Sequence, residues 1–251
     1  MKKMIFVVAL IAALATLAAA QNASIGESVV SRGKAPVMSS TFHSIQPPTA
    51  PSYCKPCLWY SGDFDPNNPN ANGLANEDDQ LVADSHIYAA WKVKGSTTKA
   101  VGAFVNSLDT AGAGIDNPTP WDIRKGASDG NCGTSVKSGS AKSTDTPTGR
   151  QGFGINEYTH RVKFKAFHLK KGTYWQNVTP QCFNNSVCGG ARYFESSEDD
   201  DPTPLNHVGT KNLLHMAIWN SSTFGINCAN PEDTFGTGIF QQFSAGVLGT
   251  K

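Results

Sequence analysis

Residues 62–79 form the stretch whose side chains best suit a metal ion. The stretch has the sequence GDFDPNNPNANGLANEDD, so carboxylate and amide oxygens recur at short spacing. Positions 1, 3, 5, 6 and 12 of a calcium-loop pattern are occupied by Asn68, Asn70, Asn72, Gly73 and Asp79. Calcium takes oxygen ligands, and the glycine permits a sharp turn around the ion. Asn at position 1 and Asp at position 12 depart from the pattern, and the same residue types form metal-free turns. A polar turn is therefore the simpler interpretation of the stretch, and calcium as a cofactor, bound by Asn68, Asn70, Asn72 and Asp79, is the alternative.

Two carboxylates flanking a glycosidic bond are the chemistry of a glycosidase. Glu157 precedes an expected strand, and an acid from residues 62–79 would be its partner. The sequence gives no distance between such acids, and a single acid at a strand end is the simpler interpretation. The acidic run from Glu195 to Asp201 is interpreted as a solvated loop. A polysaccharide hydrolase with paired carboxylates is therefore the alternative function.

Serine and histidine chemistry has weaker support. Residues 126–130, GASDG, match the G-x-S-x-G pattern of a hydrolase nucleophile elbow, but that elbow requires a helix after the serine and none is expected here. The six histidines show no HExxH motif or short paired spacing, so a zinc centre is not predicted. We expect His160 and His168 at the surface or at a strand edge. No catalytic residue is assigned, and a non-enzymatic protein is favoured.

An even number of cysteines indicates disulfides in an exported chain. The six are Cys54, Cys57, Cys132, Cys182, Cys188 and Cys228. Cys182 and Cys188 close a short loop and are expected to pair. Cys54 and Cys57 have the spacing of a redox motif, but no nearby helix is expected to lower a thiol pKa, so a structural bridge is favoured. Cys132 and Cys228 then remain as a pair that joins distant parts of the chain.

The clearest strand pattern runs from Thr159 to Leu169. Val162, Phe164 and Ala166 alternate with Arg161, Lys163 and Lys165, which is typical of a strand with one buried and one wet face. Residues 170–172 predict a turn, and a second strand follows from Thr173. We expect this pair to form the middle of a β-sandwich. The Ser-, Thr- and Gly-rich segment just before it is interpreted as a link.

The whole chain has the composition of an all-β protein. Gly 24 and Pro 14 favour many turns, and no capped helical run is visible. Short alternating segments between turn signals predict a jelly-roll-like β-sandwich of roughly eight to ten strands. Most of the tryptophans are expected in the core, and Trp175 follows Tyr174, so one of these two should face outward.

The N-terminal residues of the chain predict export. Residues 1–20 combine Lys2 and Lys3 with a short apolar run and small residues, as in a signal peptide. Residues 21–57 are expected to be a flexible Ser/Thr/Pro-rich lead-in, and residues 58–251 a single β-sandwich domain. We expect a secreted or extracytoplasmic protein with no membrane span after cleavage. A formal net charge of +1 gives no electrostatic case for nucleic acid as a partner.

A family resemblance rests on several segments between Leu58 and Val247. These are LWYSGDFD, NGLANE, WDIRKG, TPTGR, GTYW and FSAGV. They resemble a group of secreted bacterial proteins of unknown function, many of which carry a C-terminal PEP-CTERM sorting tail. That tail is absent here, and the matching segments are mostly turns and aromatic residues. The resemblance implies an exported β-sandwich, and it supplies no catalytic residues. Our first hypothesis for the function is a non-enzymatic, exported protein that binds a polymer, such as a polysaccharide, or another cell-surface component.

Overall fold

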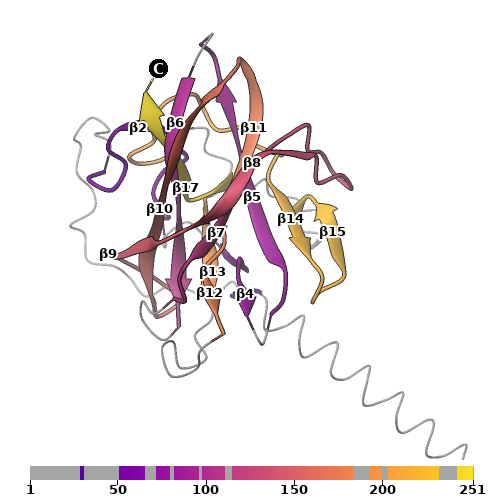
Figure 1. Ribbon diagram of the computed structural model, residues 1–251. Coiled ribbons are helices and arrows are strands. Elements are labelled where there is room, and N and C mark those ends of the chain that lie inside the picture. Colours follow the sequence, from indigo (N-terminus) through magenta and orange to yellow (C-terminus); the bar gives the residue numbers. More distant parts are fainter. Residues whose placement is uncertain are drawn as a thin grey trace, which may run out of the picture.

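The protein is built from two large β-sheets (Figure 1). The computed structural model describes residues 29–30, 51–65, 72–79, 82–95, 98–110, 115–183, 193–198, 203–231 and 242–250. Every named element within these ranges is a strand, which confirms the all-β fold class. The strands form one sheet of nine, one of six and a pair of short parallel strands. Within the described ranges, no helix is long and apolar enough to cross a membrane.

The strands have the following bounds. The nine-stranded sheet contains β1 (Val29–Val30), β2 (Cys57–Tyr60), β3 (Asn72–Ala75), β6 (Thr98–Asp109), β9 (Ser143–Gly152), β10 (Ile155–Leu169), β13 (Tyr193–Glu198), β16 (Gln242–Phe243) and β17 (Ala245–Thr250). The six-stranded sheet contains β5 (Ser85–Val93), β7 (Thr119–Lys125), β8 (Thr134–Ala141), β11 (Gly172–Val178), β14 (Ile218–Ser221) and β15 (Ile226–Ala229). The parallel pair is β4 (Asp78–Asp79) with β12 (Gln181–Cys182).

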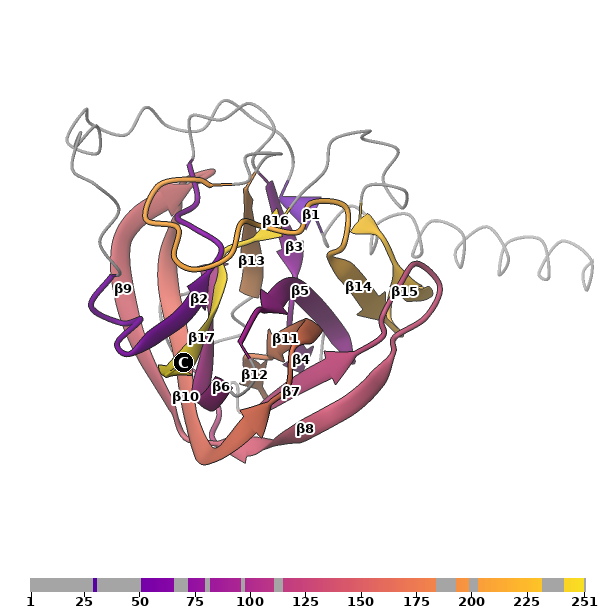
Figure 2. The same ribbon diagram turned by 90° about the horizontal axis from the view of Figure 1, so that it is seen from above.

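Strand β6 lies at the centre of the nine-stranded sheet. It pairs with β10 along one edge, and with β17 and then β13 along the other. All of these pairings are antiparallel. Alternate residues of β6 therefore face the second sheet, and the residues between them face outward. Figure 2 shows the nine-stranded and six-stranded sheets from above, with β5, β11 and β7 opposite β6 and β10.

The main core lies between the two sheets. Ile87, Ala89, Trp91 and Val93 of β5 all belong to it, as their alternation predicted. Residues Tyr88 and Ala90, on the other face of β5, are buried in a second cluster beneath the β14 region. Strand β5 is thus covered on both faces, because Leu213 and Met216, from the segment before β14, pack against this outer cluster.

The five tryptophans are all buried, with exposed fractions from 0% to 6%. The expectation that Trp175 or Tyr174 would face solvent is therefore wrong. Tyr174 faces the main core, and Trp175 packs under the segment after Leu213, where its Nε1 donates a 2.7 Å hydrogen bond to the carbonyl of Met216. The outer face of the sheet around Trp175 is covered by the segment before β14, which the strand pattern does not reveal.

Strands β10 and β11 do not pair with each other. Strand β10 pairs with β6 and β9 in one sheet, and β11 pairs with β5 and β7 in the other. The predicted turn at residues 170–172 is therefore a connection between the two sheets. Two neighbouring strands pair only when the turn folds them back in one plane, and here the chain crosses the sandwich instead.

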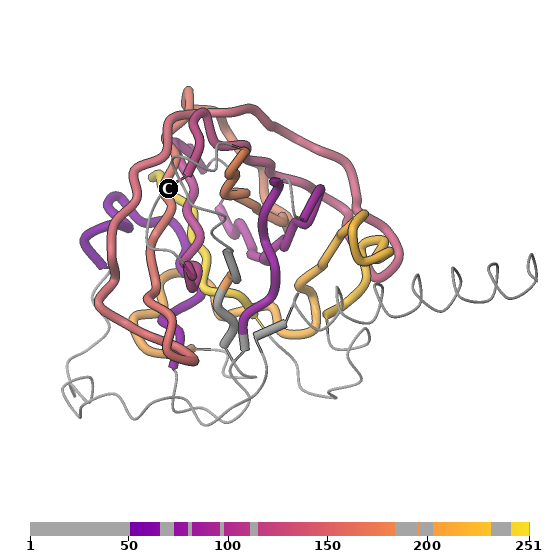
Figure 3. Tube along the Cα trace, turned by 90° about the horizontal axis from the view of Figure 1, so that it is seen from below, coloured from indigo at the N-terminus to yellow at the C-terminus, as the bar shows by residue number. Residues whose placement is uncertain are grey.

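The predicted Ser/Thr/Gly-rich link forms two strands, β8 and β9. Strand β8 pairs with β7 at the edge of the six-stranded sheet, and β9 pairs with β10 at the edge of the nine-stranded sheet. Figure 3 shows this segment running around the outside of the molecule from one sheet to the other. Its side chains are small and mostly exposed, so they lack the alternation of apolar and polar residues that marks a half-buried strand.

The folded domain begins before residue 58. Cys54 is completely buried, and Tyr53 packs against Phe104 on the outer face of the nine-stranded sheet. Strand β1, within the predicted lead-in, pairs with β3. Residues 1–20, predicted to be a signal peptide, lie outside the described residues.

Candidate functional site

Asp63, Arg150 and Glu157 form a buried charge cluster on the outer face of the nine-stranded sheet. Asp63 follows β2, Arg150 lies in β9 and Glu157 in β10. The Arg150 guanidinium lies 3.0 Å from an Asp63 oxygen and contacts Glu157 with its other nitrogen. The three residues are at most 6% exposed. The structure thus brings Glu157 together with an acid from residues 62–79, but it places a cation between them.

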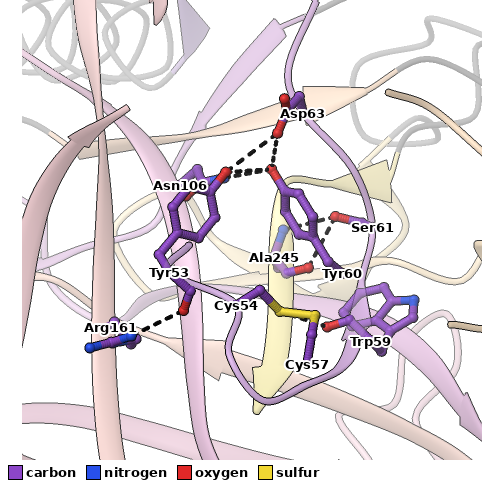
Figure 4. The surroundings of a disulfide bond; sticks show 10 residues. All are labelled: Tyr53, Cys54, Cys57, Trp59, Tyr60, Ser61, Asp63, Asn106, Arg161 and Ala245. Carbon is purple, nitrogen blue, oxygen red and sulfur yellow. Dashed lines mark hydrogen bonds between the residues drawn. A yellow bond between two sulfur atoms is a disulfide. The ribbon is translucent and has the colours of Figure 1, made fainter. Parts of the chain in front are cut away.

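Hydrogen bonds from neighbouring strands hold this cluster in place. The Tyr60 hydroxyl donates to Asp63 Oδ1 at 2.6 Å, and Asn106 Nδ2 donates to the Tyr60 oxygen at 3.0 Å (Figure 4). Asn206 donates to the other Asp63 oxygen at 2.7 Å. Burial lowers the pKa of Arg150, but the charges of Glu157 and Asp63 outweigh that effect and raise it well above the ordinary value. The guanidinium is therefore a permanent cation inside this cluster.

His160 forms a second buried charge cluster, on the face of β10 toward the other sheet. Its Nδ1 lies 2.9 Å from Asp145 of β9, and its Nε2 lies 3.1 Å from Asp109 of β6. Ser143 and Ser107 donate further hydrogen bonds to these two carboxylates at 2.6 and 3.0 Å. The His160 side chain is 0% exposed, so the expectation that it would lie at the surface is wrong.

The two carboxylates keep His160 protonated. Burial alone lowers the pKa of His160, but Asp109 and Asp145 outweigh it and raise the pKa to about 9. Burial raises the pKa of Asp145, but the hydrogen bond to His160, the charge of the imidazolium and the hydrogen bond from Ser143 together outweigh it, and the pKa falls below the ordinary value. The pKa of Asp109 is raised because burial outweighs the attraction of the imidazolium. At neutral pH the imidazolium joins β9 to β6 across β10.

The interpretation of the acidic run as a solvated loop is wrong for Glu195. It lies in β13, is 0% exposed and pairs in register with Leu74 and Ser107. Asn76 donates to its Oε2 at 2.7 Å, and its other oxygen has no partner. Burial raises the pKa of Glu195 well above its ordinary value. Burial therefore favours the protonated form of this carboxyl group, and its ionisation opposes folding.

The predicted calcium residues are only partly described. Asn68 and Asn70 lie outside the described residues. Asn72 begins β3, and Gly73 lies within it, paired with Val30 and Ser196, so Gly73 does not form the expected sharp turn. Asp79 ends β4, and its Oδ1 accepts a 2.8 Å hydrogen bond from the backbone of Val82. Among the described residues, no group of three or more His, Cys, Asp or Glu side chains could hold a metal ion.

The cysteines are bonded as the sequence predicts wherever both partners are described. Cys54 is bonded to Cys57, and Cys132 to Cys228. The first bridge closes the turn that carries Tyr53 onto the sheet (Figure 4). Cys182 is disulfide-bonded as well, and its expected partner Cys188 lies outside the described residues.

The remaining sequence candidates lie at the surface. Ser128 is exposed in the turn between β7 and β8, where its amide and carbonyl bond to those of Asn131. The next element is strand β8, so the helix required by a nucleophile elbow does not follow. His168 is exposed near the end of β10, as expected.

The arrangement of charge differs from a catalytic centre in one respect. A general acid or base must reach a substrate atom within hydrogen-bond distance. The acids of both buried clusters are instead held by Arg150 or His160 inside the fold. Sequence reasoning missed Asp109, Arg150 and His160 because each stands alone in a strand, and only the pairing of β6, β9 and β10 brings it to its partners.

Comparisons of the chain with protein families, with curated proteins and with solved structures find no match.

Proposed function

We propose that the protein is an exported, non-enzymatic β-sandwich that binds a polymer or a component of the cell surface. The observation that carries this proposal is that buried acidic side chains are paired with cations of the same fold. Asp63, Glu157, Asp109 and Asp145 are held by Arg150 and His160 in the interior or just below the surface. Such clusters fix the strands to one another and leave the outer strands free to serve as a binding surface.

Export is supported by the covalent chemistry of the fold. Two disulfides, Cys54–Cys57 and Cys132–Cys228, are formed. Disulfides persist in oxidising compartments and are rare in the cytosol. They agree with the signal sequence expected at residues 1–20 and with the resemblance to secreted bacterial proteins.

A glycan array probed with the mature protein tests the proposal. We expect retention on at least one class of polysaccharide, without release of reducing sugar from it. The matched variant is Glu157→Gln, which keeps the size of the side chain. Release of sugar by the wild-type protein that Glu157→Gln abolishes would establish the alternative, a hydrolase with paired carboxylates. Binding to no polymer or cell-surface preparation would overturn the proposed function.

Calcium is a separate proposal that rests on residues 68–79 of the sequence. A ligand that binds only the folded state raises the melting temperature by mass action. We expect added calcium to raise the melting temperature, chelator to lower it, and Asp79→Ala to remove the difference. Equal melting temperatures of the wild-type protein in calcium and in chelator would eliminate the site.

A further inference from the structure

Lysines gather at one end of the sandwich. Six exposed lysines lie in the connections β5–β6 and β10–β11 and in the parts of β6 and β10 next to them. We call this group the lysine end. Its members are Lys94, Lys99, Lys163, Lys165, Lys170 and Lys171. The pairing of His168 with Lys99 places the end of β10 beside the start of β6. Lys99 also pairs with Thr250 of β17, so the lysine end lies beside the C-terminal strand, at the top of Figure 1.

The second sheet adds positive charge at the same end. Thr173 of β11 pairs with Lys92 of β5, which is exposed. Lys125, the last residue of β7, places its Nζ 6.0 Å from the ring centre of Tyr174. The start of β11 follows directly on Lys170 and Lys171, so both sheets present lysines where they meet.

Acidic residues lie at the opposite ends of the same strands. Strand β5 follows Asp84, β6 ends at Asp109, and β10 carries Glu157 near its start. Arg150 and the protonated His160 offset part of this negative charge, whereas the six lysines are not offset in this way, so the formal net charge of +1 conceals an excess of positive charge at the lysine end. Within the described part of the chain, none of the six lysines forms an ion pair with an acid. Unpaired like charges held close together create a positive potential that attracts anions.

The neighbourhood of the lysine end excludes two ways of binding. All five tryptophans are buried, so none stacks on a sugar ring from this surface. The exposed large hydrophobic residues among those described are Val136, Phe183 and Leu205, and none belongs to the strands or turns of the lysine end. A membrane-binding surface inserts apolar side chains among the lipids. Charge is thus the property that this surface offers a ligand.

We propose that the lysine end binds an acidic polysaccharide, one that carries carboxylates along its chain. The inference rests on the proposed function and names its ligand class. Planar, bidentate recognition of phosphate favours arginine, and the two arginines next to these lysines have other partners: Arg161 donates to the carbonyl of Tyr53, and Arg124 pairs with Asp122. The lysine ammonium groups remain as flexible point charges. Lys163 and Lys165 are both exposed and lie two residues apart in β10, so two of the charges follow one another along the strand, as suits a ligand with charges repeated along its chain.

The test compares two double charge reversals in the full mature protein. Lys163→Glu with Lys165→Glu changes the lysine end, and Lys137→Glu with Lys211→Glu makes the same change of net charge at exposed lysines outside it. The probes are polygalacturonate, neutral dextran, duplex DNA and vesicles with anionic lipid. We expect polygalacturonate to bind the wild-type protein, more weakly as salt rises because exposed charges are screened. We expect the first variant to bind it at least about tenfold more weakly and the second within about threefold of wild type, since a local surface rather than net charge is responsible.

Several outcomes would overturn the inference. Equal losses in the two variants would show that net charge, and not the lysine end, is responsible. Tighter binding of DNA or vesicles than of polygalacturonate would assign the surface to another class of partner. Binding of dextran alone, unchanged in both variants, would leave the proposed function standing and remove this inference. Binding of no probe, together with a negative glycan array, would remove both. Unfolding curves of both variants should match wild type, because all four lysines are exposed.

Discussion

At the scale of single residues, His160 makes a prediction about pH. Its pKa is raised from an ordinary value of 6.5 to about 9 in the folded protein. A raised pKa gives stabilisation that is complete below pH 6.5 and is lost as the pH rises through 9, on the order of 3 kcal/mol in total. We expect the free energy of unfolding to fall between pH 7 and pH 10, and His160→Gln to be less stable but flatter over this range. If the free energy of unfolding changed with pH in the same way for both proteins, His160 would not be protonated in the folded state.

Glu195 leads to a second prediction at this scale, which concerns its replacement by glutamine. Its raised pKa means that ionisation opposes folding as the pH rises above its ordinary value of 4.5. Glu195→Gln keeps an oxygen to accept the hydrogen bond from Asn76 and cannot ionise. We expect equal stability of the two proteins near pH 4, and a gain of at least about 1 kcal/mol for the variant at pH 8. A variant less stable than wild type at pH 8 would show that Glu195 is charged and paired.

At the scale of elements, β10 divides into two halves. Val162 is 0% exposed in the main core, but Phe164 is only half-buried, stacked on Trp121 with ring centres 4.0 Å apart. Ala166 is exposed although its place in the alternation predicts burial, because the register of β10 against β6 shifts between Lys163 and Phe167. The alternation therefore identifies the strand correctly and its buried residues only up to this irregularity.

Alanine substitutions along β10 check this division. Val162→Ala removes two buried methyl groups and should cost about 2 kcal/mol. Phe164→Ala should cost about 1–3 kcal/mol, below the roughly 3–5 kcal/mol of a fully buried phenylalanine. Lys163→Ala, the control between them, should cost less than about 0.5 kcal/mol. Denaturant unfolding of the three variants gives the comparison, and a cost for Lys163→Ala equal to that for Val162→Ala would mean that both faces of the strand are buried here.

At the scale of the whole molecule, the two described disulfides differ in the length of chain they close. Cys132 and Cys228 are separated by 96 residues and join the β7–β8 turn to β15, whereas Cys54 and Cys57 are separated by 3. A bridge restricts the unfolded chain more as its loop lengthens, so replacing Cys132 and Cys228 with serine should cost about 3–5 kcal/mol. The same change at Cys54 and Cys57 should cost clearly less. Thermal melts of the two double variants decide this, and a larger loss for the short loop would assign its effect to packing of Tyr53 and Cys54.

The sequence by itself determined the fold class, the local strand patterns and the bridges Cys54–Cys57 and Cys132–Cys228. The fold class and the strands depend on the alternation of neighbouring residues and on turn residues, and the bridges depend on a small even number of cysteines. All of these can be seen directly in the sequence. It could not determine that β10 and β11 belong to different sheets, or that β8 and β9 are strands. Those outcomes depend on which edges meet in space.

Only the tertiary structure decided the environment of the charged residues. Arg150, His160 and Glu195 look like surface residues in the sequence, yet strand pairing places each one in the interior beside its partner. The lysines of β6 and β10 are likewise far apart in the chain but lie on two strands that pair in the sheet. The net charge reveals neither the buried charged residues nor the grouping of the lysines. It is a sum over residues, whereas the electrostatic field depends on where each charge lies.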